Sequence, residues 1–183
     1  MLTHQAGVIY YYNVSIYHLV QSITEATDLQ QLKEIISGVV GETCWAASFS
    51  YGDELSLDIG AKVPYSQKLM AGKEKGAWML GTRATVWELK GTSQTIVTSN
   101  DDPETARQKV KVIEGAVITA IETNYPELAL TVTFSNGCQL ILFPEHDEDS
   151  DLPYWEMFTP YHMILKVGPG AKWSFTRSDV RAE

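Results

Sequence analysis

The seven residues from Glu145 to Asp151, EHDEDSD, place five carboxylates and one histidine in a single short segment. An apolar run, ILFP, leads into the segment, and the aromatic pair Tyr154 and Trp155 follows it. Carboxylates at this density can bind a divalent cation, carry out acid–base catalysis, or lie in water as a charged loop. The functional interpretation of the sequence depends on which of the three applies.

The spacing of the acidic run allows one specific test of a metal site. Asp147, Asp149 and Asp151 have the alternate spacing with which an EF-hand calcium loop begins. Such a loop continues with a glycine and ends with a glutamate at its twelfth position, and this chain has Leu152 and Phe158 there. The calcium motif therefore fails. The three aspartates remain weak metal candidates in a segment that we expect to be a solvated loop.

Other catalytic patterns are missing from the sequence, which has no GxSxG elbow, no HExxH pair and no phosphate-binding glycine loop. Cys44 and Cys138 belong to no metal-ligand spacing and lie in strand-like stretches, so we expect two small buried side chains. His162 lies in a predicted strand, which favours a structural role. A hydrolase using Cys138 and His146 stays open but rests on spacing alone. No catalytic residue and no cofactor is assigned.

Composition and charge limit the classes of partner. The chain has 183 residues, of which 44% are hydrophobic and 20% charged, as is typical of one globular domain. Its net charge is −9, and residues 91–183 carry 14 acidic against 7 basic side chains. A surface of that sign repels nucleic acid and anionic lipid, so neither is expected as a partner. No secretion signal or membrane span is predicted, and we expect a cytoplasmic protein.

Residues 1–27 are predicted to form an N-terminal arm followed by a short helix. The helix is predicted by apolar residues at helical spacing. These are Ile16, Leu19, Val20 and Ile23. The preceding stretch VIYYYNVSIY has high β propensity and no charge, so it is prone to aggregate if left uncovered. It can lie on its own sheet or pair with a second subunit; we favour a homodimer with residues 7–26 in the interface.

Two further helices are predicted from capping residues and periodicity. In the first, Asp28 is the expected N-cap of an apolar stripe that ends at Val39. In the second, Asp102 is the N-cap, Pro103 takes the first helical position, and Gly115 ends the helix.

The stretch LALTVTFSNGCQLILFP predicts a β-hairpin. Two alternating apolar runs flank Asn136 and Gly137, a dipeptide typical of a tight type I′ turn. The residues expected on the buried face are Leu128, Leu130, Val132, Phe134, Leu140 and Leu142.

A similar hairpin occurs earlier, because FSYGDELSL (49–57) aligns without gaps on FSNGCQLIL (134–142). The chain therefore has two similar halves, 28–91 and 102–176, and both a true duplication and a chance likeness remain open. Antiparallel units of this kind bury their apolar faces by packing together. We predict a mainly β (α+β) fold, an antiparallel β-sandwich or open barrel with two or three helices, as a single domain over 28–183.

Four stretches carry a resemblance to a known family: GETCWAASFSYGDELSLDIG, WMLGTRATVWELK, LALTVTFSNGCQLILFP and VGPGAKWSF. Together they resemble a widespread family of small bacterial proteins with a domain of unknown function. That family has a tryptophan-bearing first hairpin, a strand that ends in a second tryptophan, an NG or DG hairpin and a tryptophan in its tail. The resemblance covers about residues 29–176. It implies one compact domain and supplies no activity and no catalytic residue.

Two functions from different classes compete. The first is a non-enzymatic interaction protein that presents an acidic loop and an aromatic surface to a protein partner. Its expected exposed aromatic residues are Tyr10, Tyr11, Tyr12 and Tyr154. The second is an enzyme or a small-ligand-binding protein with a pocket between the sheets, although tryptophans on strands are more often core residues. Its expected lining residues are Trp78, Trp87, Trp155 and Tyr161.

Overall fold

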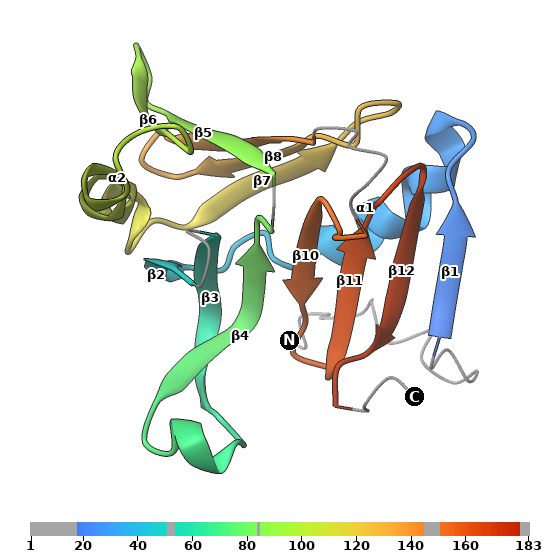
Figure 1. Ribbon diagram of the computed structural model, residues 1–183, viewed down its shortest axis with the longest axis horizontal. Helices are drawn as coiled ribbons and strands as arrows, with labels where there is room; N and C mark the ends of the chain where they lie inside the picture. Colours follow the sequence, from blue (N-terminus) through green and yellow to red (C-terminus); the bar gives the residue numbers. More distant parts are fainter. Residues whose placement is uncertain (1–17, 51–53, 84, 145–150, 180–183) are drawn as a thin grey trace, which may run out of the picture.

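Alternating apolar residues assemble two antiparallel sheets that pack face to face in the computed structural model (Figure 1). The structure describes residues 18–50, 54–83, 85–144 and 151–179. The larger sheet has seven strands in the order β1-β12-β11-β10-β4-β3-β2, and the smaller has five in the order β6-β5-β9-β8-β7. The sandwich predicted from the sequence is confirmed, and the described strands do not close into a barrel.

The strands of the larger sheet, in spatial order, are β1 (His18–Ser22), β12 (Lys172–Arg177), β11 (Met163–Val167), β10 (Trp155–Phe158), β4 (Glu74–Gly81), β3 (Leu55–Pro64) and β2 (Cys44–Phe49). Those of the smaller sheet are β6 (Thr95–Thr98), β5 (Val86–Lys90), β9 (Gln139–Phe143), β8 (Leu130–Phe134) and β7 (Ile118–Thr123). The chain crosses between the sheets after β4 and again after β9. Each predicted half therefore contributes strands to both sheets.

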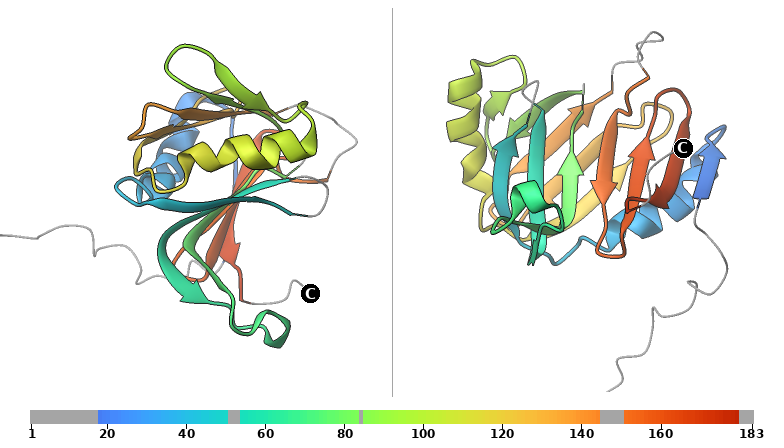
Figure 2. Two further views of the ribbon diagram at one scale, coloured as in Figure 1. Left: turned by 90° about the vertical axis from the view of Figure 1, so that its left-hand side faces the viewer. Right: turned by 60° about the horizontal axis from the view of Figure 1, so that its bottom comes forward.

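Two helical segments lie at different edges of the sandwich (Figure 2). Helix α1 (Gln30–Ser37) follows the short 3₁₀ helix η1 (Ala26–Leu29) and contacts β7. Helix α2 (Pro103–Lys109) continues into η4 (Val110–Ile113), and together they contact β2 and β6. A further helical turn, η3 (Lys68–Met70), lies at the tip of the β3–β4 hairpin. No described helix is long and apolar enough to cross a membrane.

The helix predicted around residues 16–23 is wrong for the described part of that segment, which forms strand β1. Its backbone pairs with β12, with Leu19 opposite Phe175 and Gln21 opposite Trp173. A helix would have turned Leu19 and Val20 to the same side, whereas the strand leaves Val20 54% exposed on the outer face. The sheet edge supplies hydrogen-bond partners that an isolated short helix lacks. Residues 1–17 lie outside the described part of the chain.

The two other helices are confirmed, with one correction to the capping. Asp102 is the N-cap of α2, and its carboxylate accepts a hydrogen bond from the Thr105 amide at 3.0 Å. Asp28, however, is the third residue of η1, and the N-cap is Glu25. The Asp28 carboxylate reaches back and accepts hydrogen bonds from the Thr24 amide at 2.7 Å and the Glu25 amide at 3.1 Å. The chain enters the helix one turn earlier than the apolar stripe suggests.

The β8–β9 hairpin is confirmed, but its turn is not of type I′. The strands pair with Thr133 opposite Gln139, and the Phe134 amide donates to the Cys138 carbonyl at 2.9 Å, so the three residues 135–137 form the loop. Gly137 has a φ of +82°, and Asn136 is not among the described non-glycine residues with positive φ. A three-residue loop whose last residue is a glycine with positive φ is typical of a type I turn followed by a bulge. The Asn136 side chain is used elsewhere, because its amide donates to the Val112 carbonyl at 2.8 Å.

The two similar hairpins differ in pairing. In the β2–β3 hairpin Phe49 is opposite Leu55. In the β8–β9 hairpin the aligned Phe134 bonds to Cys138, and Leu140 is opposite Val132. The hairpins also belong to different sheets. The strand pairing does not repeat with the sequence, and the duplication stays a prediction of the sequence alone.

Replacing Gly137 with valine should destabilise the protein by about 2 kcal/mol, because a β-branched residue disfavours positive φ. For a chain of this size that corresponds to a fall of about 4–8 °C in melting temperature. Calorimetry of Gly137→Val beside Gly137→Asn checks this, since asparagine tolerates the left-handed region. Equal melting temperatures for the two variants would contradict the turn assignment.

Candidate functional site

Three of the four aromatic residues predicted to line a pocket lie in the core. Trp78 on β4, Trp87 on β5 and Trp155 on β10 are 7%, 2% and 0% exposed and belong to one hydrophobic cluster. The indole N–H of Trp155 donates to the Leu128 carbonyl at 3.1 Å. The tryptophan side chains therefore fill the space between the sheets in which the pocket was expected.

Tyr161, the fourth of these residues, is 63% exposed and lies in the turn between β10 and β11. The structure does not bring it into the buried cluster of the three tryptophans. His162, predicted in a strand, follows it in the same turn and has a φ of +57°. The strand begins one residue later, at Met163. Pro160 shortens β10 here, because proline cannot donate to the strand ladder.

Both cysteines are buried and unbridged, as the sequence predicts. Burial raises the pKa of the Cys44 thiol to about 12, and the carboxylates of Glu114 and Asp58 add to the shift. Burial also raises the pKa of Cys138. The reactive thiolate is therefore disfavoured at both positions, which removes them as candidate nucleophiles.

The acidic run falls mostly on residues that the structure does not describe. Asp147, Asp149 and His146 lie outside the described residues, and Asp151 is exposed at the run's far end. Among the described residues there is no group of three or more histidine, cysteine, aspartate or glutamate side chains that could hold a metal ion.

A cluster that the sequence did not suggest lies where β4 leaves the larger sheet. Arg83 Nη1 is 2.9 Å from Glu54 Oε2, and Arg83 Nε is 3.6 Å from Glu156 Oε1. Glu156 is the only charged residue among the buried polar residues of the described chain. It lies opposite Gly81, where an added Cβ would be 3.5 Å from Glu156 Cγ. The glycine leaves room for the carboxylate and the guanidinium on the outer face of the sheet.

Burial and backbone conformation distinguish this cluster from an ordinary surface ion pair. Burial raises the pKa of the Glu156 carboxyl, whereas the cations of Arg83 and Lys166 oppose the shift. Arg83 has a φ of +47°, a conformation that costs a non-glycine residue about 1–2 kcal/mol. Shifted pKa values and strained backbone both concentrate at functional sites. The cluster of Glu54, Arg83 and Glu156 is therefore the strongest candidate site in the described residues.

The two threonine hydroxyls of the crossover beside the cluster are engaged in structural hydrogen bonds. The Thr82 hydroxyl accepts a hydrogen bond from the Leu55 amide at 3.2 Å, and the Thr85 hydroxyl donates to the Tyr154 carbonyl. Both hydroxyls thus tie the crossover to neighbouring strands. This arrangement acts as an electrostatic clamp on the passage from β4 to β5, rather than as an acid–base pair beside a reactive group.

The sequence held one weak signal for this cluster. In YWEMF, Glu156 is a single carboxylate between two apolar residues of a predicted strand. Its partners come from positions 54 and 83, which no local pattern connects to it.

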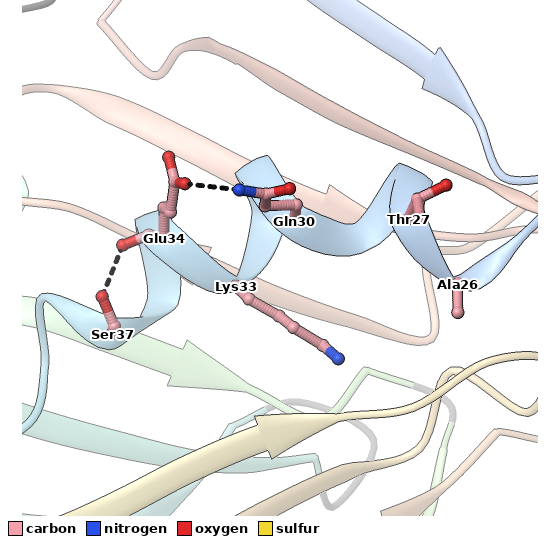
Figure 3. A pocket seen from close by; sticks show the side chains of 6 residues that line it. All are labelled: Ala26, Thr27, Gln30, Lys33, Glu34 and Ser37. Atoms are coloured by element: carbon pink, nitrogen blue, oxygen red, sulfur yellow. Dashed lines mark hydrogen bonds between the residues drawn. The ribbon is translucent and has the colours of Figure 1, made fainter.

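A second surface feature is an open depression along η1 and α1 (Figure 3). Its lining residues are Ala26, Thr27, Gln30, Lys33, Glu34 and Ser37. All six are exposed, and two internal hydrogen bonds, Gln30 to Glu34 at 3.5 Å and Ser37 to the Glu34 carbonyl at 2.7 Å, run along the helix. The depression is the solvent face of one helix and has no buried polar group to orient a ligand.

The raised pKa of Glu156 predicts a specific dependence of stability on pH. The folded state holds the proton of the Glu156 carboxyl more tightly than the unfolded state, so protonation of Glu156 stabilises the fold. This stabilisation is complete below pH 4.5, the ordinary pKa of the group, and is lost as pH rises through the folded-state pKa. The unfolding free energy of wild type relative to Glu156→Gln should therefore fall as pH rises above that value. Urea titrations of both proteins across the acidic range measure it.

Glu88→Gln is a matched control of opposite sign. Hydrogen bonds from Thr95 and Lys90 lower the pKa of the Glu88 carboxyl. The contribution of Glu88 to the free energy of unfolding is therefore present above the ordinary carboxyl pKa and is lost as pH falls through the lowered pKa. If the two variants give the same slope against wild type, the assignment of a buried, proton-retaining Glu156 is wrong.

Comparison with family models, with characterised proteins and with solved structures finds no match to this chain. The family resemblance of the sequence motifs stays a prediction of the sequence.

Proposed function

We propose that this chain is a non-enzymatic interaction protein whose sandwich presents the acidic segment 145–151 to a basic face of a protein partner. The observation that carries the proposal is the pair of apolar side chains beside that segment. Phe143 at the end of β9 is 42% exposed and Leu152 is 44% exposed, so large apolar side chains stand at both ends of the acidic run. Apolar anchors within a charged rim are typical of protein interfaces.

The aromatic part of this surface differs from the one expected. Tyr154 is 6% exposed, so it is buried rather than presented. Its ring packs where a Cβ on Gly168 would lie 2.5 Å from Cδ2, and its hydroxyl accepts from the Gly170 amide at 3.0 Å. Gly168 in the VGPG turn makes the room for the ring. Tyr10, Tyr11 and Tyr12 lie outside the described residues.

The competing function, an enzyme or ligand binder with a pocket between the sheets, receives less support. Trp78, Trp87 and Trp155 are buried against other core residues. A ligand between the sheets would have to displace packed indoles. Truncation of a buried tryptophan to alanine typically lowers the free energy of unfolding by roughly 3–5 kcal/mol, so this displacement would be costly. The strongest polar cluster also has its hydroxyls engaged in structural hydrogen bonds.

A homodimer through the N-terminal segment is the second part of the proposal. Among the described strands, β1 pairs only with β12 and forms an edge of the larger sheet. The opposite edge, β2, is contacted by the chain after η4, because the Gly115 amide donates to the Cys44 carbonyl at 2.7 Å. An edge strand next to an apolar, β-prone segment favours pairing with a second copy about a two-fold axis.

The interaction surface is tested by site-specific photo-crosslinking in cells with the photoreactive residue at position 143 or 152. Both positions should capture the same protein, and Asp147→Asn, Asp149→Asn and Asp151→Asn combined should abolish the capture. Position 112 is the control, because Val112 is 46% exposed and its carbonyl accepts from Asn136 in the turn at the opposite end of the β8–β9 hairpin from Phe143. Capture that is equal at 112, or insensitive to the triple substitution, rejects the proposal.

The same triple variant distinguishes interaction from metal binding. Without a bound metal, removing three like charges should leave the melting temperature unchanged or slightly raised. Thermal shift with millimolar calcium or manganese provides the measurement. If either ion stabilises the wild type and not the variant, the acidic segment is a metal site.

Dimerisation is tested by removing residues 1–17 and keeping β1, since the buried Ile23 and the pairing with β12 belong to the fold. Light scattering should show a dimer for the full chain and a monomer for the truncated one. Val20→Lys in the full chain should weaken the dimer in the same direction, by adding like charge on the edge strand. A monomeric full-length protein contradicts the proposal directly.

A further inference from the structure

The β3–β4 hairpin extends beyond the larger sheet and ends in η3 (Figures 1 and 2). We call residues 60–76 the hairpin extension. Within it Lys62, Val63 and Pro64 pair with Gly76, Lys75 and Glu74, respectively. Three paired residues at about 3.3 Å each place the tip roughly 10 Å past the start of the extension, which exceeds the Debye length of about 8 Å in physiological salt. The tip therefore interacts with a partner largely independently of the charge on the body.

The direction of the extension is fixed by a β-bulge. The register shifts between Ile59 and Lys62, and Gly60 has a φ of +76°. Opposite the bulge, a Cβ on Gly76 would lie 2.3 Å from the Ile59 backbone nitrogen, so only glycine fits. The Asp58 carboxylate accepts a hydrogen bond from the Gly76 amide at 2.7 Å. Bulges of this kind set the direction of a strand pair.

The tip presents one apolar side chain on an ordered turn. Leu69 is 97% exposed, the largest value among the exposed large hydrophobic residues of the described chain. The turn is held by backbone hydrogen bonds, with the Tyr65 amide donating to the Lys73 carbonyl at 3.1 Å and the Lys73 amide to the Met70 carbonyl at 3.0 Å. A preorganised leucine loses little conformational entropy when a partner covers it.

The charge of the extension is opposite to that of the rest of the chain. It contains four lysines and one glutamate, a net charge of +3, so the remaining residues carry −9 − 3 = −12. Two of the lysines are held on aromatic rings, Lys62 at 4.5 Å from the Trp45 centroid and Lys75 at 5.6 Å from that of Tyr65. Lys68, next to Leu69 in sequence, and Lys73, whose amide donates to the Met70 carbonyl, are both exposed. The tip thus combines one exposed apolar side chain with two exposed positive charges.

We propose that the hairpin extension is a docking element that inserts Leu69 into an apolar pocket rimmed by carboxylates on an acidic partner protein. The charge complementarity selects the acidic rim, and the lone exposed leucine selects a small pocket. An anionic membrane is less suitable, because a single exposed leucine adds little insertion energy. This surface is separate from the acidic segment and binds the opposite charge, so the inference goes beyond the proposed function.

The test uses the full chain as the target for a phage-displayed library of random linear peptides. Enriched peptides should contain aspartate or glutamate on both sides of an aliphatic or aromatic residue. Leu69→Ser should weaken their binding about tenfold or more, as expected for the loss of one buried leucine side chain. Lys68→Glu combined with Lys73→Glu should also weaken it, and added salt should reduce wild-type binding.

Val112→Ser is the matched control, because it removes an exposed aliphatic side chain that belongs neither to the hairpin extension nor to the acidic segment, and it should leave the affinity for these peptides unchanged. All variants should have the same melting temperature as the wild type, since the substituted side chains are exposed. No enrichment of acidic peptides, or equal binding to Leu69→Ser, overturns the inference. Leu69-dependent binding to vesicles of phosphatidylserine and phosphatidylcholine, with none to pure phosphatidylcholine, also overturns it, because the occupant is then a lipid surface.

Discussion

The relative position of the two sheets depends on tryptophan side chains that are both buried and hydrogen-bonded. Trp87, Trp155 and Trp173 are at most 2% exposed and supply the largest buried volumes between the sheets. Two of their indole N–H groups also reach fixed carbonyls, Trp155 to Leu128 at 3.1 Å and Trp173 to Asp28 at 3.4 Å. Burial supplies the free energy, whereas the hydrogen bonds select one alignment, because a buried N–H without a partner is costly. The same residues thus contribute both to stability and to the alignment of the two sheets.

Local signals in the sequence were sufficient for the elements that are stabilised locally. The Asp102 cap, the β8–β9 hairpin and the burial of both cysteines follow from residues within a few positions of each other. Strand β1 could not be predicted in this way, because its partner β12 lies about 150 residues further along the chain. The prediction of a type I′ turn at Gly137 was wrong for a related reason. The Asn136 side chain donates to the Val112 carbonyl in η4, and Asn136 does not adopt a positive φ.

The candidate site illustrates the same limit. Glu54, Arg83 and Glu156 come from three separate strands or turns and meet only after the larger sheet has assembled. A single carboxylate in an apolar strand is consistent with an exposed position until the register places it opposite Gly81 and beside Arg83. Likewise, Tyr154 is buried only because Gly168, in a distant turn, leaves space for its ring. Sequence patterns give the face of a strand, and the tertiary neighbours decide how deeply that face is buried.

The partly buried ion pairs at Arg83 are better understood as fixing the geometry of the crossover than as a source of stability. Desolvating charges offsets much of their attraction, and the positive φ at Arg83 adds a further cost. A neutral, unstrained residue at this crossover would fold at lower cost, but it would leave the path from β4 to β5 less defined. That path determines where β5 lies, and Val86 on β5 pairs with Phe143. Through this pairing the clamp sets the position of Phe143, one of the two apolar side chains on which the proposed interaction rests.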